Sequence, residues 1–92
     1  MAGQSPYLEV TFRYGKALAA YLYLPRKEGD HSHSVKKHAQ ALLVDLTEDG
    51  RPIGIEITIP TAVTVEDVNE VLHSYGLNPI EPEDLAPLKL VA

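Results

Sequence analysis

The 92-residue sequence contains no cysteine and no tryptophan, and it has one phenylalanine and one methionine. Without cysteine, the chain has no disulfide framework, no thiolate zinc site and no cysteine nucleophile. Long apolar runs are also missing, since the longest, residues 17–24, falls far short of the about 20 residues that cross a bilayer. The first residues, MAGQSPYLEV, lack the charged start and apolar core of a signal peptide. We therefore expect a cytoplasmic protein with no membrane segment.

An excess of positive charge is absent as well. Residues 1–63 contain equal numbers of acids and bases, whereas residues 64–92 contain six acids and only one base, Lys89. Proteins that bind nucleic acid usually present a basic face to the phosphates, so the overall balance disfavours nucleic acid as a partner. The local exception is RKEGDHSHSVKKH, residues 26–38, which holds four of the eight Lys and Arg residues and three of the four histidines.

The length predicts a single domain over residues 1–92 with a thin core. A chain of this size buries little more than about 60% of its unfolded surface. Association with a second copy is a common way for so small a domain to bury more apolar area. A partner, and a homodimer first of all, is therefore expected.

Apolar periodicity predicts strands first and one helix near the end. Period-two alternation marks strands at 7–14, 17–24, 39–46 and 53–59, with a long polar loop at 25–38 that could include a fifth strand near Val35. Thr64 as the N-cap, Asp67 three residues later and Gly76 past the end delimit a helix. We predict an α+β fold: an antiparallel β-meander of four or five strands at 7–59, with one face covered by the helix at 64–76.

Two finer expectations concern the first hairpin and the tail. The first hairpin is predicted to turn through the three residues 15–17, with Leu18, Leu22 and Leu24 opposite Tyr14, Val10 and Leu8. The tail, residues 77–92, is interrupted by proline and could add an edge strand through Leu88, Leu90 and Val91.

The stretch DLTEDGRPIGIEI, residues 45–57, has acids and a glycine spaced almost as in an EF-hand calcium loop. Helices flank an EF-hand loop, whereas short, branched aliphatic segments flank this one. A two-residue turn at Asp49 and Gly50 would pair each apolar residue with another. The predicted pairs are Leu42 with Ile57, Val44 with Ile55 and Leu46 with Ile53. We therefore interpret the stretch as a β-hairpin with Asp49 and Gly50 as its structural turn.

The same stretch resembles the signature hairpin of a family of short bacterial proteins of unknown function, whose pattern reads DxDxDGRxxGIEI. YLEVTFRYGKALAAYLYL is similar to the first two strands of that family, so the resemblance covers about residues 7–59. The chain departs from the family in the turn RYGKA and at Thr47, where the family often has aspartate. The resemblance implies an antiparallel meander and brings no activity, cofactor or site residue.

Two polar groups could carry chemistry. His31, His33 and His38 are candidate metal ligands, but the neighbouring lysines repel a cation and a flexible loop holds an ion poorly. Asp45 and Glu56 could face each other diagonally as an acid pair, but their place as polar residues on the less buried face of the hairpin is the stronger interpretation. We predict no catalytic residue, no metal and no cofactor, with a metal-dependent or hydrolytic enzyme as an open alternative.

The face of the sheet away from the helix is the predicted site. Tyrosines suit an interface because they are large, stiff and able to form hydrogen bonds. Gly54, in mid-strand, permits a neighbouring side chain to approach closely on that face. The leading hypothesis is a non-catalytic interaction module, homodimeric through this face or by exchange of the tail, unless the tail or the long loop covers the face. The alternative is a regulatory protein that binds nucleic acid or a toxin-like partner through residues 26–38. The predicted interface residues are Ala19, Tyr21, Tyr23, Ala41 and Leu43.

Overall fold

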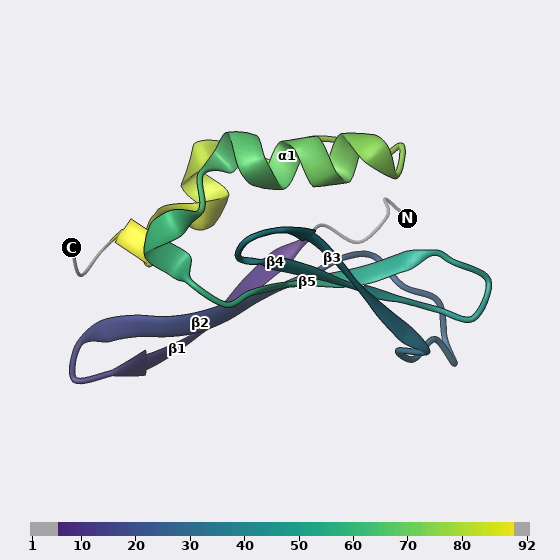
Figure 1. Cartoon of the computed structure of the whole chain (residues 1–92), viewed down its shortest axis with the longest axis horizontal. Coiled ribbons are helices and arrows are strands. Elements are labelled where there is room, and N and C mark those ends of the chain that lie inside the picture. Colours follow the sequence, from purple (N-terminus) through teal and green to yellow (C-terminus); the bar gives the residue numbers. More distant parts are fainter. Residues whose placement is uncertain (1–5, 90–92) are drawn as a thin grey trace.

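The computed structural model of the chain describes residues 6–89 and has an antiparallel sheet with one α-helix (Figure 1). This confirms the predicted α+β class. The strands are β1 (Tyr7–Arg13), β2 (Lys16–Tyr23), β3 (Ser34–Ala39), β4 (Leu42–Leu46) and β5 (Pro52–Ile57). They are followed by the short 3₁₀ turn η1 (Pro60–Ala62), the helix α1 (Val65–Ser74) and the 3₁₀ segment η2 (Pro82–Lys89).

The five strands lie in the order β1-β2-β5-β4-β3, which corrects the predicted simple meander. The chain crosses from β2 to the far edge of the sheet, and β5 then returns to the centre and pairs with β2. The reason is apolar content: Ile53, Ile55 and Ile57 are each at most 1% exposed and need neighbours on both sides. β3 carries Lys36 and Lys37, which suit an edge strand because exposed lysines discourage further pairing.

The hairpin of β4 and β5 keeps its predicted central pairs but turns differently. Leu42 faces Ile57 and Val44 faces Ile55, as predicted. The loop, however, has three residues, 48–50, closed by a hydrogen bond from the Thr47 N–H to the Arg51 carbonyl at 2.9 Å. Gly50 occupies the left-handed position of this loop, with φ +86°.

A β-bulge reconciles the longer loop with the predicted pairs. The register shifts between Asp45 and Leu46, so that Leu46 faces Pro52 and the predicted partner Ile53 is the extra residue of the bulge. Ile53 still points into the core, where it is 1% exposed. The bulge thus allows a three-residue loop while the isoleucines of β5 stay on the core face of the sheet.

The predicted register of the first hairpin is wrong. Its turn consists of Tyr14 and Gly15, which both have positive φ (+53° and +77°), as a type I′ turn requires. Together with a bulge further along the hairpin, this turn places Leu8 opposite Leu22, rather than the predicted Leu24. A bulge between Thr11 and Phe12 takes Leu18 out of the apolar row, and Leu18 stays 50% exposed.

Helix α1 begins as predicted and supplies the cover for one face of the sheet. The Thr64 hydroxyl accepts from the Asp67 N–H at 3.1 Å, and the Asp67 carboxylate accepts from the Thr64 N–H at 3.0 Å, which completes the capping box. Val68, Val71 and Leu72 are buried against the leucines and isoleucines of the sheet. Among the helices of residues 6–89, none is long and apolar enough to cross a membrane.

The tail packs on the same side as α1. Leu85 and Leu88 of η2 are 2% and 4% exposed and belong to the core, so the predicted edge strand is wrong for Leu88. Leu90 and Val91, the other residues of that prediction, lie outside the described residues. Figure 1 shows α1 and η2 on one side of the sheet, and within residues 6–89 no helix lies on the other side.

Candidate functional site

The side of the sheet that points away from α1 is here called the open face. The strand pairing arranges its side chains in two rows that run across all five strands. In the order β1, β2, β5, β4, β3, row one is Tyr7, Tyr23, Gly54, Asp45 and Val35, and row two is Glu9, Tyr21, Glu56, Leu43 and Lys37.

Tyr21 lies across Gly54 at the middle of the open face. A Cβ atom on Gly54 would overlap the Tyr21 phenol, so the glycine provides the space that the ring fills. The Tyr21 hydroxyl donates a hydrogen bond to Oδ2 of Asp45 at 2.6 Å, and the Ser32 hydroxyl donates to Oδ1 at 3.2 Å. Partial burial and the bond to Asp45 raise the pKa of Tyr21 above its ordinary value. Asp45 is therefore engaged in holding the ring, which favours a structural role over the acid-pair alternative.

Tyr23 forms a second ordered group with Tyr7, which sequence reasoning missed. The two rings stack with centroids 4.6 Å apart, and the Tyr23 hydroxyl donates to the Glu9 carboxylate at 2.9 Å. The Arg26 guanidinium lies 5.6 Å from the Tyr23 centroid. With the correct register, the alternation in YLEV would have placed Tyr7 opposite Tyr23.

Of the other three predicted interface residues, two lie on the open face and one lies in the core. Leu43 is half-buried in row two, and Ala19 lies beside Tyr21 in a shallow hollow of about 170 Å³. Ala41 is 3% exposed and belongs to the core, so its predicted place on the open face is wrong. The cause is that Ala41 lies in the turn between β3 and β4, outside the regular strand that begins at Leu42, so strand alternation does not apply to it.

Two large apolar side chains of the open face remain exposed. Tyr7 is 62% exposed on β1 and Val35 is 57% exposed on β3, at opposite edges of the same row. Within residues 6–89, η2 packs on the helix side, and the loop between β2 and β3 contacts the open face through Arg26 at Tyr23 and Ser32 at Asp45. The open face is thus ordered by its own hydrogen bonds and is largely uncovered in the described part of the chain.

The three candidate metal ligands are not brought together. His31 and His33 line one open groove, where Nδ1 of His31 lies 3.1 Å from the Gly29 carbonyl oxygen, whereas Nε2 of His38 lies 2.7 Å from the Tyr75 hydroxyl. Burial, and secondarily the charge of Lys36, lower the pKa of His38. Over the described range 6–89, the His, Asp and Glu side chains form no group of three placed to hold a metal ion.

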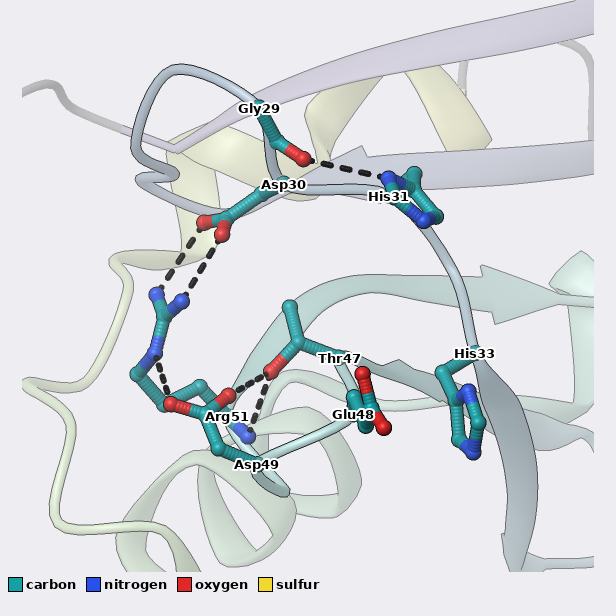
Figure 2. Close-up of a pocket in the computed structure, with 8 residues that line it drawn as sticks. All are labelled: Gly29, Asp30, His31, His33, Thr47, Glu48, Asp49 and Arg51. Atoms are coloured by element: carbon teal, nitrogen blue, oxygen red, sulfur yellow. Dashed lines mark hydrogen bonds and ion pairs between the residues drawn. The ribbon is translucent and has the colours of Figure 1, made fainter.

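Asp49 of the calcium-like stretch belongs to an ion-pair cluster with Arg51 and Asp30, beside an open groove of about 470 Å³ (Figure 2). Arg51 donates to both carboxylate oxygens of Asp30, at 2.7 and 3.0 Å, and to Asp49 at 3.1 Å. Thr47 accepts from the Arg51 N–H at 3.0 Å and donates to Asp49. The cluster ties the loop before β3 to the turn before β5, which agrees with the hairpin interpretation.

Arg51 gives the cluster a pH dependence. Its hydrogen bonds lower the pKa of Asp30 from 3.8 to about 2. Because the pKa is lowered in the folded state, the ionised carboxylate stabilises the fold above pH 3.8, and this contribution is lost as the pH falls towards about 2. Acid unfolding followed by circular dichroism should show wild-type stability falling more steeply over this range than that of Asp30→Asn. Glu28→Gln, at an exposed position, is the control, and equal slopes for wild type and Asp30→Asn would contradict the assignment.

The bases of residues 26–38 do not share one surface. Arg26 donates to the Ile53 carbonyl at 2.8 Å. Lys36 and Lys37 are neighbours on β3 and therefore point to opposite faces of the sheet. This arrangement gives less support to a phosphate-binding loop than the charge count alone.

Comparison of the chain with protein-family models, with curated proteins and with solved structures gives no match. The resemblance of residues 7–59 to a family of short bacterial proteins therefore stays a prediction, and the evidence on function comes from the geometry of the chain itself.

Proposed function

We propose that the chain is a non-catalytic assembly module that forms a homodimer through its open face. The observation that carries the proposal is the exposure of Tyr7 and Val35 in a row whose other aromatic ring, that of Tyr23, is already held in place. Ordered aromatic side chains lose little conformational entropy on binding, which favours association.

A second copy is the partner that fits the open face best. Its charges are mixed, with Glu9 and Glu56 on one part and Lys37 on another, so neither a strongly acidic nor a strongly basic partner matches all of it. A surface that carries both signs can complement itself across a two-fold axis. Pairing would also enlarge the apolar area that this small domain buries.

Sedimentation at increasing concentration tests the proposal. The wild-type chain should show the mass of a dimer, whereas the double variant Tyr7→Lys and Val35→Lys should weaken association by at least about 100-fold, because two cations would enter an apolar contact. Tyr14→Asn is the matched control, since Tyr14 is 92% exposed at the hairpin tip, away from the two rows. A wild-type chain that stays monomeric up to millimolar concentration would refute the proposal.

A further inference from the structure

We propose that the two copies pair about a two-fold axis that runs parallel to the strands and passes over β5, with Glu56 of each copy beside the axis. This inference rests on the proposed function and specifies its geometry. It makes Glu56 the residue that limits the strength of pairing.

The strand order defines what such an axis brings together. Because β5 is the middle strand, the rotation lays β1 of one copy on β3 of the other and β2 on β4. A rotation about the strand direction also keeps each row opposite the same row. The expected contacts can therefore be read from the strand register alone.

The two edges of the open face are complementary under this rotation. In row two, Glu9 on β1 meets Lys37 on β3 of the second copy, so opposite charges face each other at both ends of the interface. In row one, Tyr7 meets Val35, and these are the two apolar side chains that the single chain leaves most exposed on this face. Aligned sheets cross at about 30°, and the long side chains at the edges can span the resulting offset.

The middle strands agree with the same placement. Tyr21 reaches from β2 over Gly54 to Asp45 on β4, so its ring lies near the axis and would face the Tyr21 ring of the second copy, and such aromatic pairs are favourable. Gly54 meets Gly54 near the axis, where the Tyr21 rings fill the space above both glycines.

An axis across the strands fits less well. It would lay β3 on β3, and the open-face side chains of that strand in the two rows are Val35 and Lys37. Lys37 would then enter the interface with no carboxylate opposite it, which is costly because a desolvated charge needs a partner. The axis parallel to the strands gives each Lys37 a carboxylate.

Glu56 is the one residue of the two rows that would meet a like charge in the proposed interface. It is exposed on the central strand in row two, so the two Glu56 carboxylates would lie close to each other across the axis. Like charges brought together in an interface weaken it. We therefore infer that repulsion between the two Glu56 carboxylates lowers the affinity of the dimer. Replacing Glu56 with a neutral residue should raise that affinity.

Two single charge reversals, mixed together, test the axis. A copy with Glu9→Lys and a copy with Lys37→Glu should each dimerise at least about tenfold more weakly than wild type, because like charges then face each other at both edges. In the mixture both edges become attractive again, and a heterodimer of wild-type strength is expected. Within one chain the two positions are about 19 Å apart across four strand spacings, so the recovery must arise between chains.

Glu56→Gln removes the charge and keeps the size and shape of the side chain. This variant should lower the dissociation constant of the dimer about tenfold. Glu70→Lys, at an exposed position of α1, is the control for charge reversal and should leave association unchanged. Native mass spectrometry and sedimentation measure the wild type, the four single variants and the mixture. A wild-type monomer would refute the proposed function itself. A wild-type dimer without preferred heterodimers, or without tightening by Glu56→Gln, would overturn the axis while leaving the dimer in place.

Discussion

Replacing Gly54 with alanine is expected to lower the free energy of unfolding by about 1–3 kcal/mol, although alanine is usually favoured over glycine in a strand. The added Cβ would overlap the Tyr21 phenol, so the ring must leave its place above the strand. The move would also break the hydrogen bond of 2.6 Å from Tyr21 to Asp45. The steric and hydrogen-bond costs outweigh the entropic gain, which is at most about 1 kcal/mol.

A double-mutant cycle separates this contact from other effects of the substitution. In a Tyr21→Ala background the space above Gly54 is empty, so Gly54→Ala should there be neutral or stabilising. Chemical denaturation of the four chains should give a coupling free energy of about 1–3 kcal/mol. Additive effects would show that the ring does not depend on the glycine. All four chains must be compared at one protein concentration, because dimer formation stabilises the folded state by mass action.

Replacing Leu72 with alanine should lower the free energy of unfolding by about 2–5 kcal/mol. Leu72 is 1% exposed and lies in the core cluster between α1 and the sheet. Alanine would leave a cavity at that contact, since Val68 and Val71 are already buried beside it. A domain of this size has only about 5–15 kcal/mol of stability in total, so the change is a large fraction of it.

Glu70→Ala is the matched control for Leu72→Ala, because Glu70 lies on the same helix and is exposed. Its effect should stay within about 0.5 kcal/mol. Thermal unfolding followed by circular dichroism compares the two variants with wild type. Equal unfolding temperatures for the two variants would contradict the packing of α1 on the sheet.

The local features of the fold could be predicted because they depend on residues close together in the sequence. Thr64 and Asp67 are three residues apart, and their capping box fixes the start of α1 without help from the rest of the chain. The central pairs of β4 and β5 likewise follow from alternation on both sides of a short turn, Val44 with Ile55 among them.

The strand order and the bulges could not be predicted because they depend on contacts between distant segments. Nothing near β2 in the sequence shows that its second neighbour is β5, since this pairing arises from the need of three isoleucines for cover on both sides. Bulges shift the register by one residue within a strand, which period-two alternation does not reveal. For this reason the predictions failed at Leu18 and at Ile53. The prediction for Ala41 failed because this residue lies in the turn before β4 rather than in a strand.

The candidate site was predicted in part for the same reasons. Tyr21, Tyr23 and Leu43 follow the alternation of regular strand segments, and the structure places them on the open face. Tyr7 was missed because its place beside Tyr23 requires both the type I′ turn at Tyr14 and Gly15 and the bulge between Thr11 and Phe12. A bulky residue at positive φ is uncommon there, so the sequence favoured a longer loop.

The central claim is that the open face of one copy contacts that of another, and an isotope-filtered NMR experiment tests it most directly. One copy carries ¹³C-labelled valine and the other is unlabelled. Tyr7 and Val35 lie on opposite edge strands, about 19 Å apart within one chain by strand spacing, so a nuclear Overhauser effect between them must cross between copies. The proposed dimer predicts a cross-peak between the Tyr7 ring and the Val35 methyl groups. A sample with the mass of a monomer and no such cross-peak would contradict it.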